Sequence, residues 1–423
     1  MSTGTIRRRL MGSGSSGHQL PPLWLSCAAL TAAITAGFGI QRWIDHFVNA
    51  PYAEDFRLGY VAAEIGLSRG WSHIYDLDLQ RQLAAGFGPV AVITPDHNNV
   101  TPPILAWLMA PLTLFPLQTG YLIWTLVSLA ALVAAWWLVC PGKGLARVTL
   151  LLIAIALYPM HYTFWLGQSG TLSIAGLALT WWFLMRERWG AAGAVLAVTM
   201  FLKPQVLLLL PVALLITGRW KPVLCCALVG AVLAVITVVS LGLYGIDAWS
   251  RSIAYTAPSP IHTAVTFAYL FGRGPVATAV EVALAAIALA LAWYRRDRLD
   301  LVFALGIVGT TASAFYFHEY EPAVLILPAW IVLGSRPSVP QRVWLLLGIA
   351  AAQFIALGLP IPMLVWEAGW IGWLGLEPWL ARRELPLRAA APQLLGADSG
   401  RTPVQPREFS GAGAGTRTPD HSV

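Results

Sequence analysis

Apolar stretches of about 20 residues recur along the chain, and short polar or basic clusters separate them. A helix of about 20 apolar residues can cross a hydrocarbon core of about 30 Å, and backbone groups in lipid must be satisfied inside such helices. The alternation of polar and apolar residues that marks barrel strands is absent. The pattern therefore predicts an all-α polytopic membrane protein with roughly 12 transmembrane helices.

One segment, residues 42–99, interrupts this pattern and collects much of the polarity of the chain. It is followed by residues 102–116, an apolar stretch bounded by prolines that is short for a membrane span. We expect 102–116 to form a juxtamembrane helix in the leaflet beside the loop. The charged residues of the interrupting segment are seven acids and four arginines: Asp45, Glu54, Asp55, Glu64, Asp76, Asp78, Asp96, Arg42, Arg57, Arg69 and Arg81.

Composition supports a membrane protein and argues against nucleic acid as a partner. Hydrophobic residues make up 57% of the chain and charged residues 11%, whereas a soluble domain is about a quarter charged. The formal net charge is +7, but the basic residues lie in short clusters between apolar runs. Such clusters are typical of the ends of membrane spans.

The basic clusters also predict the orientation, because cytoplasmic loops carry the excess of Lys and Arg. With the N-terminus in the cytoplasm and a first span near 22–41, 17 basic residues fall inside and 7 outside. The length of that first apolar run favours a retained anchor over a cleaved signal peptide. We therefore expect a multi-pass protein of the cell (inner) membrane.

This orientation divides the chain into three parts. Residues 1–21 form a basic cytoplasmic N-terminus, and residues 22–388 form the transmembrane domain. Residues 389–423 are rich in Pro, Gly, Ser and Arg, which predicts a disordered cytoplasmic tail. Within the domain, residues 42–118 form a large first extracytoplasmic loop.

The other noteworthy polar residues fall on the same external face. An ionisable residue within or beside the membrane is costly and is a functional candidate by default. Four of these residues also have a structural interpretation. Glu319 and Glu321 could be solvated loop residues, His161 an interfacial histidine, and Lys203 a side chain that reaches the outer headgroups. The set comprises His97, Asn98, His161, Gln168, Lys203, Gln205, Arg251, His262, Arg273, His318, Glu319, Tyr320 and Glu321.

Five short motifs stand in order along the chain: Asp55-Phe56 with Tyr60 to Ala63, Ile74-Tyr75-Asp76, Thr101-Pro102-Pro103 with Leu112 to Pro116, Gly167-Gln168-Ser169, and Leu202-Lys203-Pro204-Gln205. In order and spacing they resemble the motifs of glycosyltransferase family 87, the DUF2029 group. The resemblance spans residues 20–380, nearly the whole folded chain. Two positions depart from the family pattern: Thr101 replaces the usual aromatic residue, and Thr171 stands near the usual asparagine.

The resemblance implies a GT-C-like membrane bundle whose first external loop carries the catalytic acid. The implied activity is transfer of a hexose, mannose foremost, from a polyprenyl-phosphate sugar to an extracytoplasmic cell-envelope glycan or glycolipid. No nucleotide sugar is implied, and no visible motif requires a cofactor. No metal ligands are assigned, although the carboxylates leave room for a divalent ion.

Asp55 is the predicted catalytic base. The acceptor hydroxyl must lose a proton as it attacks the anomeric carbon, and a carboxylate within hydrogen-bond reach can take it. Displacement opposite the leaving phosphate would invert that carbon, by the in-line logic of inverting glycosidases. Asp76 and Glu54 are the other candidates, and the structural alternative is an ion pair of Asp55 with Arg57 or Arg251.

The donor's phosphate requires a cation, and its polyprenyl tail requires a groove between spans. Lys203 is the first candidate for the phosphate, with Arg57, Arg251 and Arg273 behind it. The predicted substrate contacts are Tyr60, Gln168, Gln205, His318, Glu319 and Tyr320.

Two other classes of protein remain open. Broken helices with charges near the membrane are typical of secondary transporters, so a transporter or lipid flippase is the main alternative. A scaffold or assembly factor, with the loop and the tail as docking surfaces, is the other. The charges at the outer rim and the long loop favour the transferase.

Overall fold

The fold is known from a computed structural model, which describes residues 21–49, 54–87, 93–94 and 97–389. The chain divides into two units, Met1–Glu377 and Pro378–Val423. The description below concerns the first unit. In the second, residues 378–389 are helical. The predicted N-terminus, 1–21, and tail, 389–423, fall almost entirely outside the described residues.

The regular elements of the described residues are helices, which confirms the predicted all-α class. A single bridge pairs Thr94 with His97. The first eleven helices are α1 (Leu23–Asn49), α2 (Glu54–Arg69), η1 (Trp71–His73), α3 (Leu77–Ala85), α4 (Pro103–Met109), η2 (Ala110–Leu114), α5 (Leu117–Val139), α6 (Gly144–Ala156), α7 (Tyr158–Leu166), α8 (Gly170–Leu184) and α9 (Trp189–Leu202). The others are η3 (Pro204–Val206), α10 (Leu209–Ile216), α11 (Trp220–Thr256), η4 (Pro260–Thr263), α12 (Phe267–Phe271), α13 (Pro275–Tyr294), α14 (Leu299–Ala312), η5 (Glu321–Leu325), α15 (Ile326–Gly334), α16 (Val339–Phe354), η6 (Ile355–Leu357) and α17 (Ile361–Ala389).

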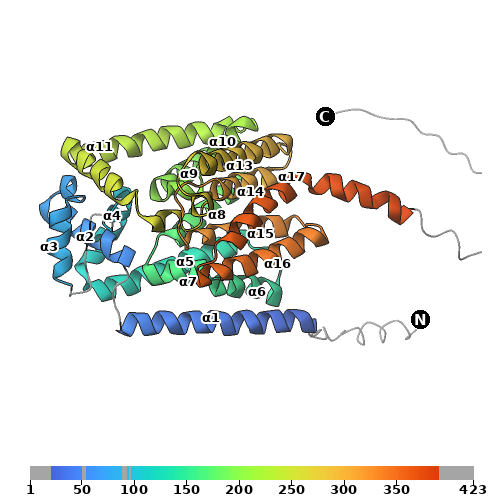
Figure 1. Cartoon of the computed structure of the whole chain (residues 1–423), viewed down its shortest axis with the longest axis horizontal. Helices are drawn as coiled ribbons and strands as arrows, with labels where there is room; N and C mark the ends of the chain where they lie inside the picture. Colours follow the sequence, from blue (N-terminus) through green and yellow to red (C-terminus); the bar gives the residue numbers. More distant parts are fainter. Residues whose placement is uncertain (1–20, 50–53, 88–92, 95–96, 390–423) are drawn as a thin grey trace, which may run out of the picture. The chain divides into compact units, whose positions relative to one another are not determined.

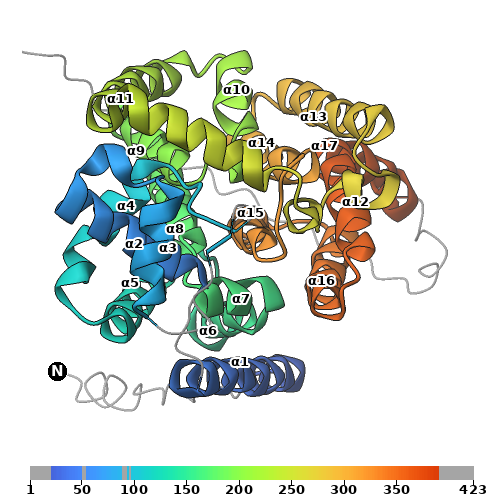
Figure 2. The same ribbon diagram turned by 60° about the vertical axis from the view of Figure 1, so that its left-hand side comes forward.

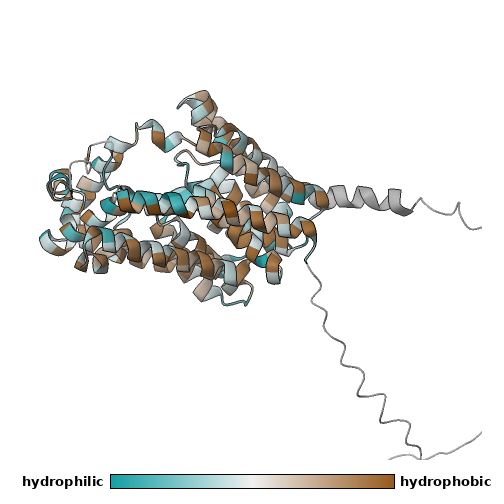
Figure 3. Cartoon of the chain, turned by 90° about the horizontal axis from the view of Figure 1, so that it is seen from below, coloured by the Kyte–Doolittle hydropathy of each residue, from teal (hydrophilic) through white to brown (hydrophobic). Residues whose placement is uncertain are grey.

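Five helical segments among the described residues are long and apolar enough to cross a membrane: α1, α5, α11, α13 and residues 339–357. A sixth arises if α6 and α7, bent by 60° at their junction, form one span. The described residues also include shorter apolar helices of 10–17 residues. In Figure 3 hydrophobic colours predominate along the long helices, as lipid contact requires. The count of about 12 spans stays a prediction.

The hydrophobic residues form two clusters. The larger is the core of the helix bundle, around the buried residues of α8, α14 and α15. The smaller unites α2, α3 and α4 with faces of α5 and α11. Figures 1 and 2 show α2, α3 and α4 side by side at one end of the bundle, with α1 running beside α6 and α7.

The segment predicted as a polar loop, residues 42–99, is largely helical where the structure describes it. It is fastened to α11 through Tyr75, whose ring stacks on that of Trp249 at 5.4 Å between centroids. Trp249 also donates from Nε1 to the carbonyl of Val100, at 3.0 Å. These contacts hold the polar segment against the bundle, which gives its side chains fixed positions.

Residues 102–116 form α4 and η2, a short helix as expected from its prolines. Pro103 begins the helix, where its missing N–H costs nothing. The face formed by Ile104, Leu105 and Met109 is buried, largely against α2.

Helix α1 continues to Asn49, beyond the end expected for the first span near residue 41. Its last turns are held because Trp43 and Phe47 contact the ring of Tyr121 on α5.

Two helix junctions expected from the sequence are present. Gly167 follows α7 in the left-handed conformation, with φ 69°, which favours glycine. A Cβ at Gly167 would lie 2.5 Å from the Cβ of Phe56, so the junction touches α2. The second junction follows α9 at Lys203, where Pro204 cannot continue the helical hydrogen bonds.

Candidate functional site

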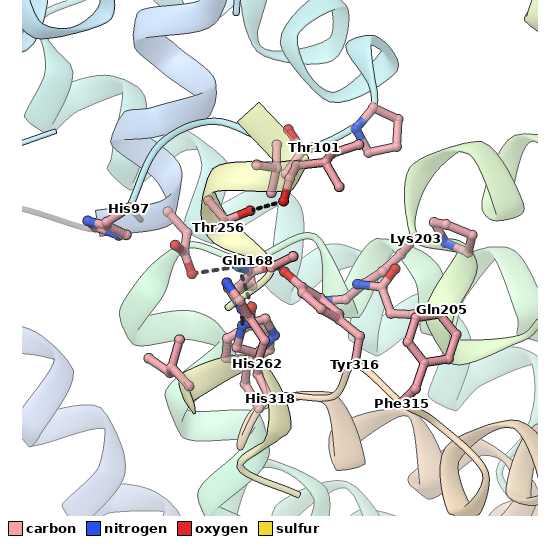
Figure 4. Close-up of a pocket in the computed structure, with 18 of the residues that line it drawn as sticks. His97, Thr101, Gln168, Lys203, Gln205, Thr256, His262, Phe315, Tyr316 and His318 are labelled. Carbon is pink, nitrogen blue, oxygen red and sulfur yellow. Dashed lines mark hydrogen bonds between the residues drawn. The ribbon is translucent and has the colours of Figure 1, made fainter. Parts of the chain in front are cut away.

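A cavity of about 670 Å³ lies where these junctions meet the polar segment. Its walls come from the start of α2, residues 97–102, the two junctions, the end of α11, residues 261–281 and residues 315–320. Figure 4 shows Gln168 near the middle, with Lys203 and Gln205 on one side and His262 and His318 below. The cavity brings together segments that are as much as 265 residues apart in sequence, from Asp55 to Tyr320.

Asp55 lies at the beginning of α2, is half-buried and lines this cavity. Its Oδ2 accepts a hydrogen bond of 2.5 Å from Nε2 of Gln168. Gln168 is held by the glycine junction, since Trp124 donates from Nε1 to the carbonyl of Gly167 at 2.8 Å. The carboxylate that the sequence predicted as the base therefore faces the cavity in a defined position.

Lys203 lines the cavity beside this pair and is buried. Its Nζ lies 3.5 Å from Oε1 of Glu321, whose side chain is fully buried. Gln205 donates to the same oxygen at 2.8 Å, and the backbone N–H of His318 donates to Oε2 at 2.9 Å. Hydrogen bonds of this kind are required for a charge pair removed from water.

Two histidines and two tyrosines, His262, His318, Tyr316 and Tyr320, line the same cavity. Nδ1 of His262 and Nε2 of His318 are 2.8 Å apart. The His318 ring stacks on Tyr320, and the His262 ring stacks on Tyr316. Burial, with the nearby His318 and Arg273, lowers the pKa of His262 to about 4, so this side chain is neutral at pH 7.

Two further predicted residues line the cavity. Glu319 accepts a hydrogen bond of 3.0 Å from the hydroxyl of Tyr158. Arg273 is exposed and donates to the backbone carbonyls of Ala257 and Ser259. Within the described part of the chain, Arg273 has no acidic side chain within 4.0 Å of it. Its charge is therefore available to an anion.

Asp76 and Tyr60 lie outside the cavity lining. Asp76 caps α3: its side chain accepts from the N–H groups of Asp78 and Leu79, and the hydroxyl of Tyr244 donates to it at 2.8 Å. Burial raises the pKa of Asp76, but these hydrogen bonds outweigh it, and the pKa is below its ordinary value. The Tyr60 hydroxyl donates to the Phe115 carbonyl at 2.7 Å, which ties α2 to η2.

The remaining predicted residues are placed as follows. Arg57 is buried on α2, away from the cavity lining. Arg251 pairs at 2.9 Å with Asp247 on the exposed surface of α11. The side chain of Glu54 falls outside the described residues. Of the four cations predicted for the phosphate, the structure brings Lys203 and Arg273 to the cavity.

Sequence reasoning did not single out Tyr316, Asn99 or Glu281, which also line the cavity. Glu281 is 6% exposed and is the sole acid in the apolar helix α13. An acid within an apolar run is itself a sign of function, so this signal was present in the sequence. Tyr316 and Asn99 carry no comparable local signal. Among the described residues, no three His, Cys, Asp or Glu side chains converge as metal ligands would.

The fold and the site define a helical membrane protein with a polar cavity whose walls combine a carboxylate, cations and aromatic rings. The model of glycosyltransferase family 87 matches residues 100–328, more than half of the chain. The chain therefore belongs to glycosyltransferase family 87 and is a membrane glycosyltransferase, which confirms the resemblance seen in its motifs. The matched residues include Gln168, Lys203 and His318 and begin after Asp55. Neither the curated proteins nor the solved structures provide a match.

Proposed function

We propose that this glycosyltransferase moves a hexose, mannose foremost, from a polyprenyl-phosphate sugar to an extracytoplasmic cell-envelope glycan or glycolipid. The observation that carries the proposal is the placing of Asp55 and Arg273 on the walls of one cavity. The first is suited to accept a proton, and the second to meet a phosphate. Exposed apolar side chains such as Ile261 and Phe315 lie at the same cavity and suit a lipid-linked substrate.

In this proposal Asp55 takes the proton of the acceptor hydroxyl as its oxygen attacks the anomeric carbon. The bond from that carbon to the phosphate oxygen breaks, and polyprenyl phosphate leaves with the bonding electron pair. Attack opposite the leaving group inverts the anomeric carbon. Charge thus moves from the acceptor side of the cavity to the phosphate side, where cations stabilise it.

We further propose Arg273 as the main contact of the donor's phosphate. Lys203 also lines the cavity, but its ammonium already lies beside the Glu321 carboxylate. Arg273 offers a planar guanidinium without such a partner among the described residues, and a guanidinium can bind a phosphate through two hydrogen bonds.

Replacement of this arginine by glutamine should raise the KM for the donor about tenfold or more, since a hydrogen bond to a charged group contributes about 1.5–3 kcal/mol. We expect kcat to change less. Arg251→Gln is the matched control, because Arg251 is also exposed but pairs with Asp247 away from the cavity. Equal donor KM values for Arg273→Gln and the wild type would remove Arg273 from the phosphate site.

The assay that tests the proposed function uses purified protein with polyprenyl-phosphate mannose, polyprenyl-phosphate glucose and GDP-mannose. Each is offered with an extract of cell-envelope glycolipids as acceptor. We expect transfer from a polyprenyl-phosphate sugar and none from the nucleotide sugar. Transfer from GDP-mannose alone would contradict the proposed donor class, and substrate movement across vesicles without transfer would favour the transporter.

The extracytoplasmic position of the cavity is also a proposal, and it rests on the basic residue distribution. Single cysteines at Ser72 and Asp297, in a variant without the four native cysteines, should differ in labelling of intact cells. An impermeant maleimide is expected to label position 72 and not position 297. The opposite labelling would invert the topology and place the active site in the cytoplasm.

A further inference from the structure

The side-chain amide of Gln168 is held at both ends. Its Nε2 donates to Oδ2 of Asp55 at 2.5 Å and to the hydroxyl oxygen of Tyr320 at 3.0 Å. Its Oε1 accepts a hydrogen bond of 3.2 Å from Nζ of Lys203. An amide nitrogen has two N–H groups, and both are engaged here. Neither N–H of this amide is therefore free to donate to a sugar hydroxyl.

The chemistry of the neighbours determines which way the amide points. A lysine ammonium can only donate, and an ionised aspartate can only accept. The orientation seen here, with Oε1 toward Lys203 and Nε2 toward Asp55, satisfies both. The reversed amide would place N–H groups against the ammonium and a carbonyl oxygen against the carboxylate, which is repulsive at each end. Lys203 thus determines which end of Gln168 meets Asp55.

Lys203 is in turn fixed by contacts that do not involve the cavity's substrates. Its ammonium lies 3.5 Å from Glu321 and 4.5 Å from the centre of the Tyr320 ring. Gln205 and the backbone N–H of His318 hold the carboxylate of Glu321. The ammonium also interacts electrostatically with Asp55. The result is a continuous series of contacts from Glu321 through Lys203 and Gln168 to Asp55.

We infer that Gln168 is a positioning residue for Asp55, and that the buried Lys203–Glu321 pair acts on Asp55 by orienting the Gln168 amide. The inference rests on the proposed role of Asp55 as the base. It replaces two expectations from the sequence, that Gln168 contacts the sugar and that Lys203 contacts the phosphate. Gln168 instead contacts Asp55 directly and Lys203 acts through Gln168, so that both residues orient the carboxylate that accepts the proton.

A direct test measures the ionisation of Asp55 without using the reaction. A water-soluble carbodiimide modifies protonated carboxyl groups, and mass spectrometry follows the modification of Asp55 as the pH is varied. Gln168→Leu removes the N–H donated to the ionised form, so the midpoint of this titration should move up by about one pH unit. The double variant Lys203→Met/Glu321→Gln, which leaves no buried charge unpaired, should move it in the same direction by a smaller amount.

The matched control is Gln353→Leu. Gln353 is a half-buried glutamine that also bridges two segments, accepting from the N–H of Tyr158 and donating to the carbonyl of Ala156 away from the cavity. We expect the Asp55 titration to be unchanged in this variant. If Gln168→Leu also leaves the midpoint unchanged, the inference is wrong and Gln168 has only a structural role.

Kinetics then separate positioning from phosphate binding. In Gln168→Leu and in the double variant, the acid limb of kcat/KM should move to higher pH with the titration, and the donor KM should stay within about threefold of the wild type. A tenfold rise in donor KM with an unmoved Asp55 titration would make Lys203 a phosphate contact and overturn the inference. Absence of transfer by the wild-type protein would contradict the proposed function but leave the carbodiimide titration to decide this point.

Discussion

Replacing Asp55 with asparagine should reduce kcat by about 10²–10⁴, the usual contribution of a general base. The amide keeps the size of the carboxylate but cannot accept the acceptor's proton. The loss should appear in kcat rather than in the donor KM, because the proposed role belongs to the transition state. The measurement is the transfer rate at saturating donor, with the amount of folded protein determined by size-exclusion chromatography.

The other loop acids serve as controls for this prediction. Asp76→Asn should retain most of the activity, because Asp76 caps α3 and binds Tyr244 outside the cavity lining. The loss of an N-cap costs about 0.5–2 kcal/mol of stability, so a lower melting temperature with near-normal kcat is expected. If Asp55→Asn keeps more than about a tenth of the activity while Asp76→Asn or Glu54→Gln is inactive, the base is another carboxylate.

Lys203→Ala should lower the free energy of unfolding by about 3–5 kcal/mol, the usual cost of breaking a buried ion pair. The Glu321 side chain is fully buried and the Lys203 side chain is 5% exposed. The alanine variant leaves this fully buried carboxylate without its countercharge. Unfolding by SDS titration in mixed micelles, followed by tryptophan fluorescence, measures this loss.

Two variants give this prediction its controls. Arg298→Ala breaks the partly exposed pair between Arg298 and Asp300, and a pair of that kind contributes about 0–1 kcal/mol. The double variant Lys203→Met/Glu321→Gln removes both buried charges and should recover most of the stability. A loss for Lys203→Ala no larger than for Arg298→Ala would show that water reaches and solvates Glu321.

Some features of the site follow from the local sequence. The apolar runs determine that the helices suit a membrane, since lipid leaves the backbone few other conformations. Gly167 and Pro204 interrupt the helices because one favours a left-handed conformation and the other lacks an N–H. Both interruptions were predicted, and each places its neighbour, Gln168 or Lys203, at the cavity wall.

Other features depend on contacts between distant residues. Asp55 and Asp76 both stand in family-like motifs, and local sequence does not separate them. The structure does so by using Asp76 as a helix cap and turning Asp55 toward Gln168. Likewise, Arg251 and Arg273 are both arginines that the sequence predicted on the external face, but Asp247 lies one helical turn from Arg251 and pairs with it.

Lys203 shows the division most clearly. Its sequence context, a helix junction broken by Pro204, was enough to predict that Lys203 lies near the site. Its partner Glu321 is more than 100 residues away in the chain. Glu321 is held in turn by Gln205, from which it is also more than 100 residues distant. The segments that pack together decide whether a buried ammonium is paired or free. The reason is that the Coulomb interaction depends on distances, and the loss of solvation depends on burial, and both exist only in the folded chain.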